Sequence, residues 1–175
     1  HTLATLVAFL KTHIKGSSYR EHPVQLIRQN LARWYPRRSE FERFINWDPD
    51  DPKKYTRNVV FSNEHMDILL MCWPPRCASS IHCHGDSSCW VSLVGGVVHE
   101  IQFAMPTLDR RFVEAEETNP TGAIGRCGKL KAIQVTKLGD LGVEDGRFET
   151  YMNNGLGIHC VENRSDEPAC VGRAH

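Results

Sequence analysis

The chain has 175 residues, of which 41% are apolar and 24% charged, a size and composition typical of one globular domain. Lysines and arginines number 21, as do aspartates and glutamates, so the formal net charge is zero. This balance argues against a nucleic-acid-binding protein and against electrostatic docking to a membrane, which both need a basic surface. No apolar run approaches the roughly 20 residues of a membrane span.

Seven cysteines and nine histidines are many for a chain of this length. The cysteines are odd in number and form no C-x-x-C pair, and no secretory signal is visible, so we expect a reduced cytoplasmic protein with free thiols. Four of them are predicted to be small core residues: Cys72, Cys83, Cys160 and Cys170. Two lie in turn-like stretches and are predicted to be exposed: Cys77 and Cys127.

Residues 1–47 predict a helical N-terminal part. Apolar residues recur at helical spacing over 2–15, which predicts an amphipathic helix. Pro23 can open a second helix, which Pro36 ends, and Ser39 can cap a third short one. We therefore expect helices to precede the remainder of the fold.

After residue 55, short runs rich in Val, Ile, Leu and aromatic residues alternate with turn residues. They predict strands near 56–61, 66–73, 79–84, 88–94, 97–103, 131–137, 149–152, 157–162 and 168–171. Gly95-Gly96 between two of these runs indicates a hairpin. The chain is therefore predicted to form a single domain over 1–175, mainly β, with a barrel or sandwich over 55–175.

The chemistry is concentrated in one predicted strand, over 79–84. Residues two apart in a strand point to the same face, so His82 and His84 present two imidazoles side by side. Two neutral imidazoles form half of a site for a divalent metal, and His159, in a late predicted strand, can provide a third. On spacing alone, the pair could equally be two exposed polar residues.

Several separated motifs resemble one family. The run His82-Cys83-His84, followed by Cys89, Gly96 and Glu100, resembles the first metal motif of the cupin barrels. It is most similar to that of the cysteine dioxygenases, which carry Cys at the place of Cys89 where most cupins have Glu. Further matches occur at 55–58, 72–73, 79–81, 151–154 and 157–163. The resemblance runs to about residue 170 and implies a cupin (jelly-roll-like) β-barrel with N-terminal α-helices.

The family oxidises the thiol of free L-cysteine to a sulfinic acid with ferrous iron and both atoms of O₂, in cysteine catabolism and taurine biosynthesis. The resemblance therefore implies that His82, His84 and His159 bind Fe(2+) and that L-cysteine and O₂ are the substrates. It also implies a cytoplasmic enzyme, for which we expect a monomer without nucleic-acid or membrane partners.

The resemblance also implies a substrate-binding side of the site. Arg57 would hold the substrate carboxylate bidentately, as a guanidinium can and an ammonium cannot. Tyr55, two residues earlier, would add its hydroxyl, and Trp73 would form a wall of the pocket. Without the family, the same three residues would be interpreted as an exposed Arg, a Tyr at the edge of the core and a core Trp.

The sequence departs from the family after Ala169. The family continues with Ser, His and Tyr at alternating positions, and in many members that Tyr is joined to the Cys at the place of Cys89 by a thioether. Here the chain reads Cys170-Val171-Gly172-Arg173-Ala174-His175, with His175 near the expected tyrosine. We therefore expect no Cys–Tyr crosslink and an apparently incomplete last strand.

Three functions stay open. The first is oxidation of L-cysteine. The second is oxidation of another small thiol such as 3-mercaptopropionate, although relatives with that preference usually lack an Arg at the place of Arg57. The third is a catalytically impaired metal-binding cupin, which the absent Ser-His-Tyr segment favours. A zinc hydrolase is disfavoured because no acidic residue lies at an obvious general-base spacing from the His pair.

Overall fold

The computed structural model describes residues 2–15, 19–33, 37–104, 130, 132–139 and 149–174. The helical elements are α1 (Leu3–His13), η1 (Tyr19–Glu21), α2 (Val24–Arg33), α3 (Arg38–Phe41) and η2 (Glu42–Phe44). The strands are β1 (Thr56–Ser62), β2 (Asp67–Trp73), β3 (Cys89–Gly95), β4 (Val98–Phe103), β5 (Ala132–Leu138), β6 (Glu149–Met152), β7 (Ile158–Glu162) and β8 (Ala169–Ala174). No helix in these ranges is long and apolar enough to cross a membrane.

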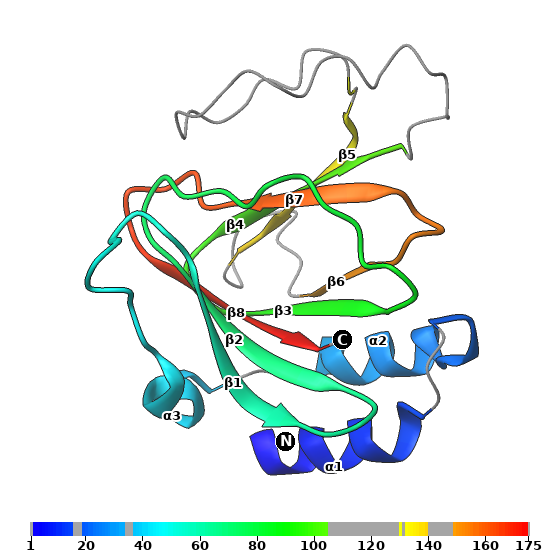
Figure 1. Ribbon diagram of the computed structural model, residues 1–175. Helices are drawn as coiled ribbons and strands as arrows, with labels where there is room; N and C mark the ends of the chain where they lie inside the picture. The colour runs from blue at the N-terminus through cyan, green and yellow to red at the C-terminus, as the bar shows by residue number, and fades with distance from the viewer. Residues whose placement is uncertain are drawn as a thin grey trace.

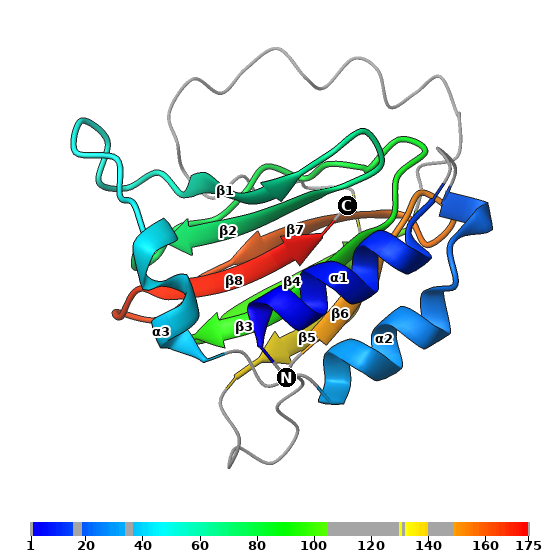
Figure 2. The same ribbon diagram turned by 90° about the horizontal axis from the view of Figure 1, so that it is seen from below.

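The strands form two antiparallel sheets that face each other, as Figure 1 shows. The larger sheet has the order β1-β2-β8-β3-β6, and the smaller has the order β5-β4-β7. Helices α1 and α2 cover the outer face of the larger sheet, which is seen from below in Figure 2. The predicted mainly β fold with N-terminal helices is confirmed.

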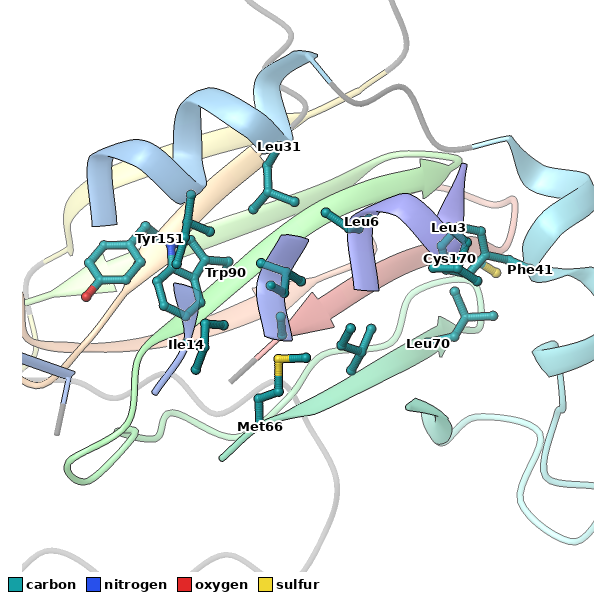
Figure 3. Packing of buried hydrophobic residues seen from close by; sticks show 14 of the residues in the cluster. Leu3, Leu6, Ile14, Leu31, Phe41, Met66, Leu70, Trp90, Tyr151 and Cys170 are labelled. Atoms are coloured by element: carbon teal, nitrogen blue, oxygen red, sulfur yellow. The ribbon is translucent and has the colours of Figure 1, made fainter. Parts of the chain in front are cut away.

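The helices and the larger sheet enclose the first apolar cluster (Figure 3). Helix α1 begins at a capping box in which Thr2 and Thr5 satisfy each other's backbone N–H groups, and it buries Leu3, Leu6 and Leu10. Burying a leucine side chain fully stabilises the fold by about 1.5–3 kcal/mol. This layer therefore supplies much of the apolar burial that holds the larger sheet in place.

Alternate residues of the same strands face the gap between the two sheets. On β2, Leu70 packs toward the helices, whereas Met71 belongs to a second cluster that also includes Val98 and Leu138 of the smaller sheet. This follows from the period of two along a strand. The inner face of the larger sheet therefore lines the space between the two sheets.

Strand β8 is hydrogen bonded on both sides, to β2 and to β3. It covers six residues, whereas the sequence predicted a strand over 168–171. Its start lies against the turn between β3 and β4, where Gly96 has φ +81°, and a Cβ on that glycine would lie 2.8 Å from Ala169. Gly96 thus allows the close approach of the two segments.

Two predicted local features are wrong. In place of a strand over 79–84, the chain forms two isolated bridges to β7, at Ala78 and at His82. The ladder is interrupted because the Ser79 hydroxyl, rather than a backbone carbonyl, accepts the Val161 N–H at 3.0 Å. Helix α3 begins after Arg37 with no side-chain cap, so Ser39 lies inside the helix.

The predicted burial holds for most cysteines. Cys72, Cys160 and Cys170 are buried, as predicted, but Cys83 is exposed and Cys77 is buried. Cys77 is buried because its backbone carbonyl accepts the Asn163 N–H at 2.8 Å, which holds this turn against the barrel. Cys83 is exposed because the segment around it is not part of a paired strand. Predictions for Pro36, Cys127 and His175 lie outside the described residues.

Candidate metal centre

The three predicted histidines converge, although they lie far apart in the sequence. His82 and His159 form a two-way backbone bridge, with N–O distances of 2.9 and 3.0 Å. The backbone N–H of His84 donates to the Asn154 side-chain oxygen at 3.1 Å, which holds the next turn beside the bridge. One nitrogen from each imidazole lies within 4.8 Å of the others.

Hydrogen bonds orient two of the imidazoles toward this cluster. Nδ1 of His82 lies 3.0 Å from the Ser80 carbonyl oxygen, and Nδ1 of His159 lies 2.7 Å from a Glu100 carboxylate oxygen. Both partners are acceptors, so each Nδ1 carries the proton and each Nε2 retains its lone pair. Metal-binding histidines in proteins are commonly oriented in this way.

Hydrogen bonds and burial also fix the position of Glu100, the residue that orients His159. It lies on β4, which pairs with β7, and its side chain is fully buried. Thr150 donates a hydrogen bond to its carboxylate, and Gln102 donates another at 3.2 Å. A buried carboxylate needs such donors to offset its desolvation. Glu100 was quoted in the sequence motif, but its contact with His159 was not predicted.

The donor set fits a divalent transition metal. Nε2 of His82 is buried and has no hydrogen-bond partner among the described residues, and such an unpartnered group costs about 1–3 kcal/mol. Burial lowers the pKa of His82, and the positive charges of Arg173 and Arg57 add to the effect, so the imidazole stays neutral. Neutral imidazoles suit Zn, Cu, Fe or Ni, and a bound ion would satisfy the buried nitrogen.

The predicted substrate-binding residues also come together. Arg57 donates to the Tyr55 hydroxyl at 2.9 Å, and the Tyr55 ring stacks on Trp73 with ring centroids 4.4 Å apart. All three line one pocket with His82 and His159. Its free volume of about 20 Å³ holds roughly one water, so a substrate requires lining side chains to shift.

Cys89 lines the same pocket from β3 and is a free thiol. Burial raises its pKa to about 11, although the nearby Arg173 opposes the shift. The thiol therefore stays protonated at neutral pH and does not compete as a thiolate ligand. That it carries no crosslink stays a prediction.

Sequence reasoning did not identify Arg173 as a residue of this site. Arg173 lines the pocket from β8, and its Nη2 lies 2.9 Å from Nδ1 of His84. The predicted strand ended at Val171, whereas β8 extends to Ala174, so the period of two that places Arg173 on the face of Val171 was not applied to it. The contact itself joins residues 89 apart, which no local pattern reveals.

The chain is similar to known proteins over nearly its whole length. Residues 1–173 match the family model described as cysteine dioxygenase type I. Cysteine dioxygenase type 1 of Bos taurus is 28% identical over 174 residues, which cover 96% of this chain and 70% of the relative. The Danio rerio protein of the same name is 29% identical over 170 residues, which cover 96% of this chain and 71% of the relative.

Solved structures also match, at lower identity. The protein TT1209 from Thermus thermophilus has a TM-score of 0.45 and 18% identity, and the match covers 77% of this chain and 90% of TT1209. A cupin-2 domain containing protein from Shewanella frigidimarina has a TM-score of 0.43 and 12% identity, and the match covers 78% of this chain and 88% of that protein.

Proposed function

Because the chain belongs to the cysteine dioxygenase type I family, we propose that it is a non-haem iron enzyme that oxidises free L-cysteine with O₂ to cysteine sulfinic acid. The observation that carries the proposal is the convergence of His82, His84 and His159, of which His82 and His159 line one pocket with Arg57. The cluster provides a metal site, and the arginine provides an anchor for an acidic substrate.

The neutral ligand set suits an anionic sulfur ligand. Three imidazoles leave the double charge of the cation uncompensated, so a substrate thiolate is attracted to it. Fe(2+) bound there would activate O₂ beside that thiolate. The sulfur loses four electrons, O₂ accepts them, and both oxygen atoms remain in the sulfinate, so no external reductant is required.

Arg57, Tyr55 and Trp73 would position the substrate. The guanidinium fork of Arg57 matches the two oxygens of a carboxylate. Its hydrogen bond to the Tyr55 hydroxyl and the stacking of Tyr55 on Trp73 restrict the rotation of all three side chains. The carboxylate end of the substrate would thereby be held at a fixed place relative to the imidazoles.

A second candidate substrate is 3-mercaptopropionate, which equals cysteine without its ammonium group. One observation favours it: no Asp or Glu is among the described residues that line the pocket, so an ammonium has no acidic partner there. Turnover of the two thiols by one iron-loaded sample distinguishes them. The proposal for L-cysteine predicts the higher kcat/KM for cysteine, and the reverse order assigns the smaller thiol.

The experiment that tests the reaction is turnover of L-cysteine under ¹⁸O₂ by the full chain loaded with Fe(2+). We expect sulfinate with both oxygen atoms labelled, and loss of the product in His159→Ala with the circular dichroism spectrum kept. Metal bound to the wild-type chain without any O₂ uptake would instead assign a metal-binding cupin without this activity.

We infer further that the enzyme acts in the cytoplasm as a monomer, on the route from cysteine to taurine. The six described cysteines are free thiols, which supports a reducing compartment. Sedimentation equilibrium tests the monomer directly, since a mass twice that of the chain would contradict it.

A further inference from the structure

Two guanidiniums line the pocket beside the histidine cluster. Arg57 lies on β1 and is exposed, and Arg173 lies on β8 and is half buried. The described residues that line the pocket include no Asp or Glu, so no carboxylate of this lining balances either charge. A charge withdrawn from water without a partner costs free energy, which a bound anion offsets. The pocket therefore favours ligands that carry acidic groups.

The larger sheet places the two arginines on one face at a set spacing. Arg57 is directly opposite Met71 of β2, which is directly opposite Val171 of β8. Arg173 follows Val171 by two residues and therefore shares its face. With strands about 4.8 Å apart and a rise of about 3.4 Å per residue, the two arginine Cα atoms lie roughly 12 Å apart. Two long side chains can reach opposite ends of one small molecule across that distance.

The protein uses only part of the hydrogen-bonding capacity of Arg173. Its Nη2 lies 2.9 Å from Nδ1 of His84, and it also contacts the Cys89 thiol. Its Nε is buried without a hydrogen-bond partner among the described residues, and the ion pairs of those residues do not include it. A guanidinium has five N–H donors in a planar fork that fits a carboxylate bidentately. Arg173 therefore has donors available for an acidic ligand.

We propose that Arg173 forms a second carboxylate subsite and that the enzyme also oxidises small thiols with two carboxylates, such as 2-mercaptosuccinate. Arg57 would bind one carboxylate, as it does for cysteine in the proposed function, and Arg173 would bind the other. The inference rests on that function, because the chemistry at sulfur is the same. The O–O bond breaks, two S–O bonds form, the sulfur loses the four electrons that O₂ accepts, and the thiol proton is released. The second carboxylate only positions the substrate.

The pocket can take such a ligand when its lining rearranges. Its free volume of about 20 Å³ holds roughly one water. Three of the lining side chains are long and flexible: Arg57, Met71 and Arg173. When the guanidinium of Arg173 turns toward a carboxylate, the space that its side chain fills becomes available to the ligand. The residue that binds the second carboxylate thus also opens the room for it.

Anion binding tests the second subsite without the reaction. Calorimetry on the chelator-treated chain compares succinate, which has two carboxylates, with butyrate, which has one and the same number of carbon atoms. Succinate should bind about 10–100-fold more tightly, the range expected for one further hydrogen-bonded charged group. In Arg173→Gln the two affinities should become nearly equal. Equal affinities in the wild type, which needs no variant, would overturn the subsite.

The control is Arg164→Gln, which removes an exposed arginine that pairs with Glu162 and does not line the pocket. It should keep the wild-type preference for succinate. Arg173→Gln is compared with it only after circular dichroism shows that both variants are folded. A preference for succinate that persists in folded Arg173→Gln would assign the second carboxylate to another residue and overturn the role of Arg173.

Turnover by the iron-loaded full chain tests the further activity. We expect O₂ uptake with 2-mercaptosuccinate, and Arg173→Gln should raise its KM about 10–100-fold while the KM for 3-mercaptopropionate, which has one carboxylate, changes little. Turnover of L-cysteine without turnover of 2-mercaptosuccinate would overturn the further activity alone. Turnover of no thiol would overturn the proposed function, and the calorimetry would still decide whether Arg173 binds a second carboxylate.

Discussion

The two faces of the larger sheet carry different kinds of side chain on the same strands. Toward the helices, β2 and β8 present Leu70 and Cys170, which pack in an apolar cluster. Toward the smaller sheet, their neighbours Met71 and Val171 line a pocket shared with Arg173. The period of two along a strand thus separates a face that stabilises the fold from a face that forms the site.

The two faces also differ in charge. The pocket face holds the guanidiniums of Arg57 and Arg173 together with the imidazoles of His82 and His159. The helix face packs in an apolar cluster, whose burial stabilises the fold. Substitutions on the two faces should therefore change different quantities, and the following predictions test that separation.

The largest expected effect is that of His82→Ala on the pocket face. Loss of one of three imidazole ligands should abolish stoichiometric metal binding and activity, while the thermal unfolding temperature changes little because the residue is only half buried. Elemental analysis after dialysis measures the metal. His65→Ala, in an exposed turn, should keep the wild-type metal content; a full complement of metal in His82→Ala would contradict the assignment.

On the helix face, Leu70→Ala should lower the free energy of unfolding by about 2–5 kcal/mol, because the residue is fully buried and the change leaves a cavity. Urea unfolding measures this. The exposed Val59→Ala should change it by less than about 0.5 kcal/mol. At a temperature where Leu70→Ala is folded, its metal affinity should equal that of the wild type. A large loss of metal affinity would contradict the view that the helix face stabilises the fold without affecting the site.

Glu100→Gln should weaken metal binding about 10–100-fold, because the carboxylate that orients His159 is replaced by a neutral amide. Calorimetry with Co²⁺ gives the affinity. Glu162→Gln is the matched control, since that carboxylate pairs with the exposed Arg164. If the two variants bound metal equally well, Glu100 would have no orienting role.

Arg57→Lys should raise KM for cysteine about 10–100-fold, since hydrogen bonds to charged groups contribute roughly 1.5–3 kcal/mol and an ammonium cannot bind bidentately. Metal content should not change. Initial rates of O₂ uptake over a range of cysteine concentrations measure KM, with Arg164→Lys as control. An unchanged KM would show that Arg57 does not bind the substrate.

The smallest expected effect is on covalent structure. Cys89 should carry no thioether, so the intact mass should equal the sum of the residues. A mass lower by two hydrogens that maps to Cys89 after proteolysis would contradict this prediction.

The sequence predicted the strands well because their side chains alternate. Strand β6 matches its predicted bounds, and β1, β2 and β4 begin or end within one residue of theirs. The segment over 79–84 has the same composition, but Ser79 replaces a backbone acceptor with its hydroxyl, so no ladder forms. Composition reports the tendency of a segment to extend, whereas pairing depends on the partner strand.

The site was predictable where a motif spans few residues. The His82–His84 spacing predicted two histidines of one cluster, and the Tyr55–Arg57 spacing predicted two side chains that line one pocket. The partners that orient the imidazoles were not predictable in this way. Glu100 and His159 are 59 residues apart, and their contact exists only because β4 pairs with β7.

The central claim, that three histidines form the metal centre of a thiol dioxygenase, is tested most directly by pairing elemental analysis with an oxygen-electrode trace on one iron-loaded sample. The account predicts one iron per chain and O₂ uptake equal, mole for mole, to the L-cysteine consumed and the sulfinate formed. Iron bound at that stoichiometry with no cysteine-dependent O₂ uptake would contradict it.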